Sequence, residues 1–227
     1  MAEPAQLLIR REFPRPGADE IEPFRNAPTG WVVDAQGRRG ALPHWIKPLS
    51  HQNRFVGTAL TVRTRPVDNL APYAALKFAK PGDVLVVAVG GSTTTSIIGD
   101  ILLGMAKNAG IVACVTDGLV RDIEGINQVG IPMFAQGLSP NSPFKDGPGE
   151  IGGTISLGDV TISPGDLLVG DIDGVIVVPR PSVRAVGAEL SAIAAKEAKM
   201  EQVVKAGTTY PAWLDDVLKS DRIRYID

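Results

Sequence analysis

The stretch VLVVAVGGSTTTSIIGDILLGMAKNAGIVACVT, residues 84–116, decides the fold. It opens with six apolar residues, Val84 to Val89, whose length and lack of alternation are typical of a strand buried on both faces of a sheet. Two glycines, a Ser/Thr cluster and a helical segment to Ala109 follow, and a second apolar run extends from Ile111 to Thr116. This order predicts a strand–helix–strand unit with parallel strands.

The flanking sequence repeats this pattern on both sides. Downstream we expect a short helix over 120–129 and a strand over 131–135, and upstream a strand over 55–64 and a helix from 68 to about 79. Short β-rich runs over 153–179, separated by Gly-Asp and Pro-Gly-Asp turns, predict a second group of strands packed on the first. Helices over 181–206 and 211–219 follow, so the expected class is α/β with C-terminal helices.

The length of 227 residues fits one large domain. Residues 1–17 are rich in proline and arginine and are expected to form an N-terminal arm, followed by a single domain over 18–227. Weak helices over 19–27 and 29–38 and a loop over 40–53 are expected at the start of that domain.

The charge balance argues against nucleic acid as the main ligand. Lys plus Arg number 23 and Asp plus Glu 25, so no basic excess is available to neutralise phosphates. The longest apolar runs have about eight residues, far fewer than the ~20 of a membrane span. The N-terminal sequence lacks the order of a signal peptide. We therefore expect a cytoplasmic protein with no membrane partner.

The cysteine and histidine content limits the kinds of metal site. The single cysteine, Cys114, lies in an apolar run and is expected to be a small buried hydrophobe. The only histidines are His44 and His51, so a Cys/His zinc site is nearly excluded. Any metal is expected to be held mainly by carboxylates.

Two glycine-containing motifs are expected to be structural. Gly147, Gly149 and Gly152 match a dinucleotide-binding string, but Pro148 interrupts it and no strand precedes it, which predicts a flexible loop. The Asp-Ile-Asp-Gly sequence from Asp171 lacks the rest of a calcium-binding loop and predicts a turn.

Polar residues at the starts of two predicted helices form the candidate site. Gly99 and Asp100 lie in the first turns of one helix, and Arg121 and Asp122 follow the next buried strand and its turn. Because neighbouring parallel strands end at the same edge of a sheet, we expect these residues to meet where open α/β folds bind ligands. An arginine there can clamp a carboxylate, and an adjacent carboxylate can hold a hard cation. A dipole-matching aspartate and a surface Arg–Asp pair are the alternatives, and the residues alone do not decide.

A carboxylate on an apolar helix face is a further candidate. In the long predicted helix an apolar stripe runs from Val186 to Val204, and Glu197 falls on it between Ile193 and Met200. An ionised carboxylate on an apolar face needs a partner. We expect either a glutamate at the edge of the stripe that reaches solvent, or a functional carboxylate at a buried seam, inside the chain or between subunits.

The spacing of the site residues resembles a known family. Gly99-Asp100 followed after twenty residues by Arg121-Asp122 resembles the signature of the class II 4-hydroxy-4-methyl-2-oxoglutarate aldolases, which share a superfamily with the regulator of ribonuclease E activity A (RraA). The resemblance covers roughly residues 20 to 207 in the same order. Further matching segments are 57–63, 68–69, 81–84, 117–118, 164–166 and 173–179.

The resemblance implies a β/β/α swivelling-type (RraA-like) fold, a homotrimer or hexamer, and an active site between subunits that uses a divalent metal cation, Mg²⁺ or Mn²⁺. Asp122 resembles the direct metal ligand, and Arg121 resembles the clamp on the pyruvyl carboxylate. Asp100 resembles the residue that holds a metal-bound water. The backbone of Gly99 to Leu102 resembles the substrate loop, formed by Gly99, Asp100, Ile101 and Leu102.

The same resemblance assigns a role to the C-terminal helix. Glu197 resembles the glutamate that such enzymes bring in from a neighbouring subunit, and the helix register leaves Glu201 as the alternative.

The implied reaction cleaves a carbon–carbon bond next to a 2-oxo acid, as in 4-hydroxy-4-methyl-2-oxoglutarate, and releases pyruvate through an enolate. The sequence offers no conspicuous Schiff-base lysine, so a metal is expected to accept the charge as a Lewis acid. N–H groups at the helix start can add oxyanion stabilisation. The same site is expected to decarboxylate oxaloacetate, because that reaction passes through the same enolate.

Two other functions compete with the lyase. One is an RraA-like regulator that binds and inhibits a ribonuclease without catalysis. That branch is shorter and departs from the Arg-Asp pair, whereas this chain has Asp122 and a C-terminal helix with Glu197. The other is a methyltransferase, but no Gly-rich adenosylmethionine loop follows a first strand. We therefore expect an enzyme that acts on a small 2-oxo acid.

Overall fold

The computed structural model describes residues 6–226. The chain divides after Leu190 into two compact units, which are considered separately below. The expected division into an N-terminal arm over 1–17 and a single domain over 18–227 stays a prediction. Among the described residues, no helix is long and apolar enough to cross a membrane.

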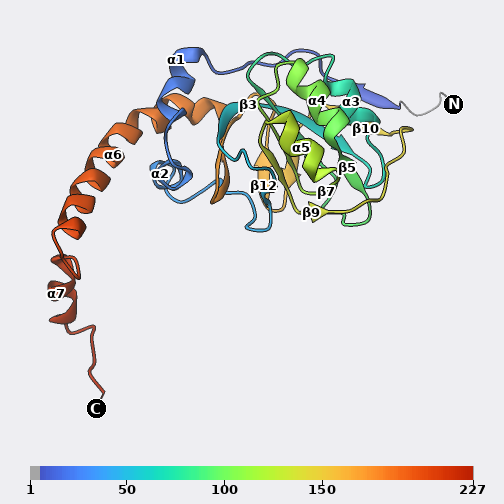
Figure 1. The fold of residues 1–227 in the computed structure, drawn as a ribbon. Coiled ribbons are helices and arrows are strands. Elements are labelled where there is room, and N and C mark those ends of the chain that lie inside the picture. The colour runs from blue at the N-terminus through green and yellow to red at the C-terminus, as the bar shows by residue number, and fades with distance from the viewer. Residues whose placement is uncertain (1–5, 227) are drawn as a thin grey trace. The chain divides into compact units, whose positions relative to one another are not determined.

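A nine-stranded mixed sheet forms the centre of the first unit (Figure 1). Four of its strands pair in parallel with one another, which confirms the predicted parallel unit. They are β3 (Phe55–Thr64), β4 (Asp83–Ala88), β6 (Ala113–Thr116) and β8 (Met133–Ala135). The remaining strands are β1 (Leu7–Ile9), β2 (Lys47–Pro48), β10 (Gly149–Ile151), β13 (Leu167–Asp171) and β14 (Gly174–Val178).

Strand β4 is buried on both faces, as its unbroken apolar sequence predicts. Leu85 and Val87 belong to the hydrophobic cluster on one face, and Val84 and Val86 belong to the cluster on the other. Cys114 lies in the first of these clusters, and burial raises the pKa of its thiol, which confirms that it is a small buried hydrophobe. The helices that cover this face are α3 (Leu70–Ala75), α4 (Asp100–Asn108) and α5 (Ile123–Val129).

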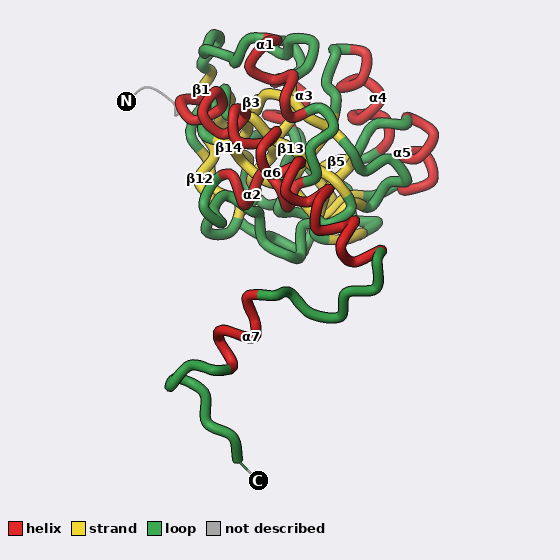
Figure 2. The backbone as a smooth tube through the Cα atoms, turned by 90° about the vertical axis from the view of Figure 1, so that its left-hand side faces the viewer, coloured by secondary structure: helices red, strands yellow, loops and turns green. Residues whose placement is uncertain are grey.

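A third hydrophobic cluster packs the β13–β14 hairpin against helical segments (Figure 2). The turn of this hairpin follows Asp171, which confirms the turn predicted there. The segments are α1 (Ala18–Ile21), the 3₁₀ turn η1 (Glu22–Phe24), α2 (Thr29–Ala35) and the first turns of α6 (Val183–Lys205). A second 3₁₀ turn, η2 (Arg180–Ser182), precedes α6.

Two smaller sheets were not predicted as such. β5 (Ser96–Ile98), β7 (Leu119–Val120) and β9 (Gly137–Leu138) form a parallel three-stranded sheet, and β11 (Ile155–Leu157) pairs with β12 (Val160–Ile162). The helix expected over 120–129 begins only at Ile123, because Val120 belongs to β7. Only β11 and β12 form the expected separate strand group, since β13 pairs with β3 in the main sheet.

The N-terminal segment is part of the main sheet. β1 pairs in parallel with β10, and β10 pairs with β3. The flexible loop expected at Gly147–Gly152 is therefore wrong, because residues 149–151 receive strand partners on both sides. The pairing strands are distant in sequence, which the local glycine pattern could not show.

Arg15 ties the N-terminal segment to the core. Its Nε and Nη2 each lie 2.8 Å from an oxygen of Asp83, whose side chain is 1% exposed. Arg15→Ala is expected to lower the free energy of unfolding by about 3 kcal/mol, because it leaves a buried carboxylate without its counter-ion. Urea denaturation measures this loss, with the exposed Arg11→Ala as the matched control. A loss below about 1 kcal/mol, the value of a surface pair, would show that the pair is not structural.

The second unit contains the rest of α6 and α7 (Trp213–Leu218). Within α6 the buried residues are Val183, Val186, Gly187 and Leu190, all before the unit boundary. Glu197 is exposed, and Val204, at the end of the predicted stripe, is 60% exposed. The buried seam expected for Glu197, inside the chain or between subunits, stays a prediction.

Candidate active site

The candidate site lies where β5 and β7 end. The two strands pair in parallel with Ile98 opposite Val120, and the Arg121 backbone N–H donates to the Ile98 carbonyl over 3.0 Å. Gly99 follows β5 and Arg121 follows β7, so the predicted residues do meet. The strands that bring them together belong to the three-stranded sheet and not to the long buried strands from which we argued.

Asp122 has an unusual backbone conformation. Its φ of 60° and ψ of 45° lie in the left-handed region, which aspartate tolerates better than most residues. A Cβ placed on Gly99 would lie 2.6 Å from Asp122 Oδ2, so the carboxylate packs closely against the Gly99 backbone and would have to shift for a larger residue. Non-glycine residues in this region cluster at functional sites, which favours a role for Asp122 beyond starting α5.

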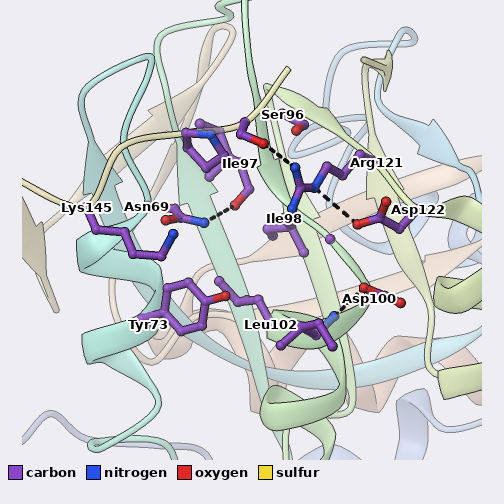
Figure 3. Close-up of a pocket in the computed structure, with 14 residues that line it drawn as sticks. Asn69, Tyr73, Ser96, Ile97, Ile98, Asp100, Leu102, Arg121, Asp122 and Lys145 are labelled. Atoms are coloured by element: carbon purple, nitrogen blue, oxygen red, sulfur yellow. Dashed lines mark hydrogen bonds and ion pairs between the residues drawn. The ribbon is translucent and has the colours of Figure 1, made fainter. Parts of the chain in front are cut away.

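The Arg121 guanidinium is held from two sides (Figure 3). Its Nε lies 3.1 Å from Asp122 Oδ2, and its Nη1 donates to the hydroxyl of Ser142. The Arg121 and Asp122 side chains are 38% and 42% exposed. An ion pair this exposed adds little to stability, and both side chains are accessible to a ligand.

Asp100 occupies the first turn of α4. Its Oδ1 accepts the backbone N–H of Ile101 over 2.7 Å. A Cβ on Gly125 would lie 2.4 Å from Asp100 Oδ2, so α5 packs its backbone against this carboxylate. Ile101 is exposed and Leu102 is buried. The first residues of α4 thus present the positive end of the helix next to Arg121.

These residues line one pocket of about 90 Å³. Ser96, the last residue of the Ser/Thr cluster in the sequence, also lies on its wall. Four further polar side chains there were not predicted as site residues, namely Asn69, Tyr73, Ser142 and Lys145. In the sequence analysis, Asn69 lay at the start of a predicted helix and in a segment that matches the family, and neither feature indicated a site. No sequence pattern around Tyr73 or Lys145 indicated a binding site. These residues reach the pocket from α3 and from the loop after β9, which are far apart in the sequence.

Asp68 supports this pocket from behind. The carboxylate is fully buried and accepts the backbone N–H groups of Leu70 and Asp146 over 2.9 and 2.6 Å. Burial by itself raises the pKa of Asp68. The two hydrogen bonds, a third from the Gly147 backbone and the charge of nearby Arg65 all lower it, and together they outweigh burial, so the pKa is lowered overall. The carboxylate therefore fastens the loop that carries Lys145 to the start of α3.

Asp68→Asn is expected to destabilise the protein by about 1–3 kcal/mol at pH 7, because charge-assisted hydrogen bonds are lost. A lowered pKa means stability that is present above the usual value of 3.8 and lost as the pH falls through the folded-state pKa. The difference between wild type and variant should therefore shrink below about pH 4. Denaturation at several pH values tests this. A difference that is independent of pH would contradict it.

A second buried carboxylate holds the loop after β4. Asp117 is 2% exposed and accepts the N–H groups of Val89 and Gly91, each over 2.7 Å. Burial raises its pKa despite these bonds. Gln136 donates to the carbonyls of Gly91 and Asp117, so the connection toward β5 is fixed at both ends.

The carboxylates of the pocket fit a hard cation. Within residues 6–226, no three His, Cys, Asp or Glu side chains gather at one point. Asp100 and Asp122 are both at the pocket. Mg²⁺ commonly binds through one or two carboxylates and completes its shell with water and substrate oxygens. This donor set fits Mg²⁺ or Mn²⁺ and does not fit a closed tetrahedral zinc site.

Comparisons with known proteins agree with the fold. Residues 29–177 match the RraA-like family model, described as Aldolase/RraA. The chain is 44% identical over 162 residues, 71% of its length and 77% of the relative, to a Halalkalibacterium halodurans protein named "Putative 4-hydroxy-4-methyl-2-oxoglutarate aldolase". It is 33% identical over 141 residues, 62% of its length and 85% of the relative, to the 4-hydroxy-4-methyl-2-oxoglutarate aldolase of Thermus thermophilus.

A solved structure agrees as well. It is described as the RNA-processing inhibitor RraA from "Thermus thermophilis" and matches with a TM-score of 0.64 and 32% identity, over 68% of this chain and 93% of that chain. A mixed α/β fold with this arrangement is the RraA-like fold. The chain belongs to the RraA-like family, in which some relatives are named as aldolases and others as inhibitors of RNA processing.

Proposed function

We propose that this protein is a divalent-metal-dependent lyase. It cleaves a 4-hydroxy-2-oxo acid such as 4-hydroxy-4-methyl-2-oxoglutarate to pyruvate, and it decarboxylates oxaloacetate as a side activity. The observation that carries this proposal is the Arg121–Asp122 pair, fixed beside Asp100 at the mouth of one pocket. Relatives named as aldolases support the same reaction class.

The charges of the pocket fit an anionic substrate. Asp100 and Asp122 balance Arg121 and Lys145. A bound Mg²⁺ or Mn²⁺ would make the pocket positive and would accept, as a Lewis acid, charge that develops on the 2-oxo oxygen. Asp122 would hold the cation directly and Asp100 through water. A positive pocket favours a substrate with two carboxylates.

The protein groups have distinct roles in this proposal. Arg121 binds the pyruvyl end, with the plane of its guanidinium set by Asp122 and Ser142. The N–H groups at the start of α4 stabilise negative charge on the same fragment. Asp100 orients the water that returns a proton to carbon 3 after the carbon–carbon bond breaks. This reaction is proposed to occur in the cytoplasm.

Glu197 is proposed to complete the site of a neighbouring subunit in a homotrimer or hexamer. Its exposure in this chain leaves it free for that contact, with Glu201 as the alternative. Glu197→Ala should lower activity by about 10- to 100-fold, the usual effect of a group that orients a metal ligand. Mixing these subunits with inactive Asp122→Asn subunits should restore part of the activity, since some hybrid sites then contain both residues.

The mixing experiment needs proof of hybrid formation, for example by mass spectrometry of differently tagged subunits. If proven hybrids show no recovery, Glu197 acts in its own subunit or does not act in the site.

The alternative function is a non-catalytic regulator of a ribonuclease, which the RraA relative supports. Such a protein should bind an RNA-degrading enzyme at micromolar concentration and release no pyruvate. The deciding assay measures pyruvate release from several 4-hydroxy-2-oxo acids and oxaloacetate, with and without Mg²⁺. If the protein captures a ribonuclease and releases no pyruvate, the regulator is favoured over the lyase.

A further inference from the structure

A buried hydrogen-bond acceptor lies on the side of the pocket away from Arg121 and Asp122 (Figure 3). Asn69 is 5% exposed, and its Nδ2 donates to the Ile97 carbonyl over 3.1 Å. This bond sets the orientation of the amide, because the reverse orientation would place two oxygens together. Within the described part of the chain, Asn69 Oδ1 has no hydrogen-bond partner.

An unpaired buried acceptor normally costs about 1–3 kcal/mol, so its persistence in a pocket points to a donor on a ligand. Tyr73 and Lys145 lie on the same side of the pocket, and neither donates to Asn69. Lys145 Nζ instead sits 5.8 Å from the centre of the Tyr73 ring. The Lys145 side chain is exposed, and a long exposed side chain can change rotamer and admit a ligand to Asn69.

We infer that Asn69 Oδ1 accepts a hydrogen bond from the 4-hydroxyl group of the substrate and thereby selects 4-hydroxy-2-oxo acids. This inference rests on the proposed function. With the pyruvyl end at Arg121, carbon 4 is the part of the substrate that extends toward the opposite side of the pocket. A carboxamide oxygen that cannot donate matches a hydroxyl group, which can.

The role is one of binding and orientation. In the cleavage, the C3–C4 electron pair stays with carbon 3, the hydroxyl oxygen forms the new C4 carbonyl, and the hydroxyl proton is released while carbon 3 gains one. No net oxidation occurs. The amide of Asn69 takes up no proton, but its hydrogen bond holds the O–H group in one orientation while the bond breaks.

Oxaloacetate separates this role from the rest of the site. It has no 4-hydroxyl group, and its decarboxylation needs the same Arg121 and Asp122. Loss of the Asn69 amide should therefore affect aldol cleavage and spare decarboxylation. The ratio of the two activities is independent of how much of a preparation is folded.

The test compares kcat/KM for both reactions in wild type and Asn69→Ala, with the exposed helical variant Asn108→Ala as the matched control. We expect aldol cleavage to fall about tenfold or more and decarboxylation to change less than about threefold. An unchanged ratio in an active variant would overturn the inference and leave the lyase intact. A wild type with neither activity would overturn the lyase and the inference together.

A measurement on the wild type covers the case in which Asn69→Ala does not fold. The 4-deoxy analogue of the substrate, 4-methyl-2-oxoglutarate, and the hydroxylated compound are compared as competitors of oxaloacetate decarboxylation. The deoxy compound should compete about tenfold more weakly. Equal competition would show that the site does not recognise the hydroxyl group.

Discussion

Asp122→Asn is expected to lower metal-dependent pyruvate release by about a thousandfold or more, because Lewis-acid stabilisation is worth several kcal/mol. Asparagine also tolerates the left-handed backbone that Asp122 adopts, and the side chain is 42% exposed, so the fold should be retained. The substitution therefore removes the charge that holds the cation and, with it, the ion pair to Arg121, while the backbone conformation is kept.

Asp159→Asn is the control for this variant, because Asp159 is an exposed aspartate in the turn between β11 and β12. Kinetic titration with Mg²⁺ and circular dichroism should show an inactive, folded Asp122→Asn protein and an unchanged Asp159→Asn protein. Activity of Asp122→Asn near the wild-type level would remove Asp122 from the metal site.

Arg121→Lys is expected to lower kcat/KM by about 30- to 150-fold, the equivalent of about 2–3 kcal/mol. Lysine keeps the charge but lacks the planar fork. It therefore loses the geometry set by the Arg121 contacts to Asp122 and Ser142. The exposed Arg39→Lys is a control of identical chemistry.

The readout for Arg121→Lys is decarboxylation of oxaloacetate, because that substrate also presents a pyruvyl carboxylate. Full retention of kcat/KM would mean that Arg121 does not bind it. A decrease in kcat alone would indicate that Arg121 contacts the substrate only in the transition state. An increase in KM alone would indicate that Arg121 binds the ground state and the transition state equally.

The parallel pairing of distant strands was predictable where the chain repeats an apolar run followed by a helical segment. The apolar runs of β3, β4, β6 and β8 are long enough to show burial, and helical segments between them require parallel pairing. By contrast, β5, β7 and β9 have three, two and two residues, which is too few for any periodicity. The meeting of Gly99-Asp100 with Arg121-Asp122 was still predicted, because each pair follows a strand and precedes or starts a helix.

The remaining features depend on distant parts of the chain. Asn69, Tyr73 and Lys145 acquire their place only when α3 and the loop after β9 approach β5. The glycine string around Gly149 became a strand because β3 and β1 supply its hydrogen bonds. Glu197 lies on a helix stripe whose apolar spacing predicts burial, and its side chain is exposed.

The most direct test of the lyase proposal is the release of pyruvate from 4-hydroxy-4-methyl-2-oxoglutarate by the full chain after chelation and after Mg²⁺ is restored. The account predicts no release by the chelated protein and full recovery on addition of the cation, with the same pattern for oxaloacetate. Undiminished release by the chelated protein would contradict the metal-dependent mechanism, and no release under either condition would contradict the lyase itself.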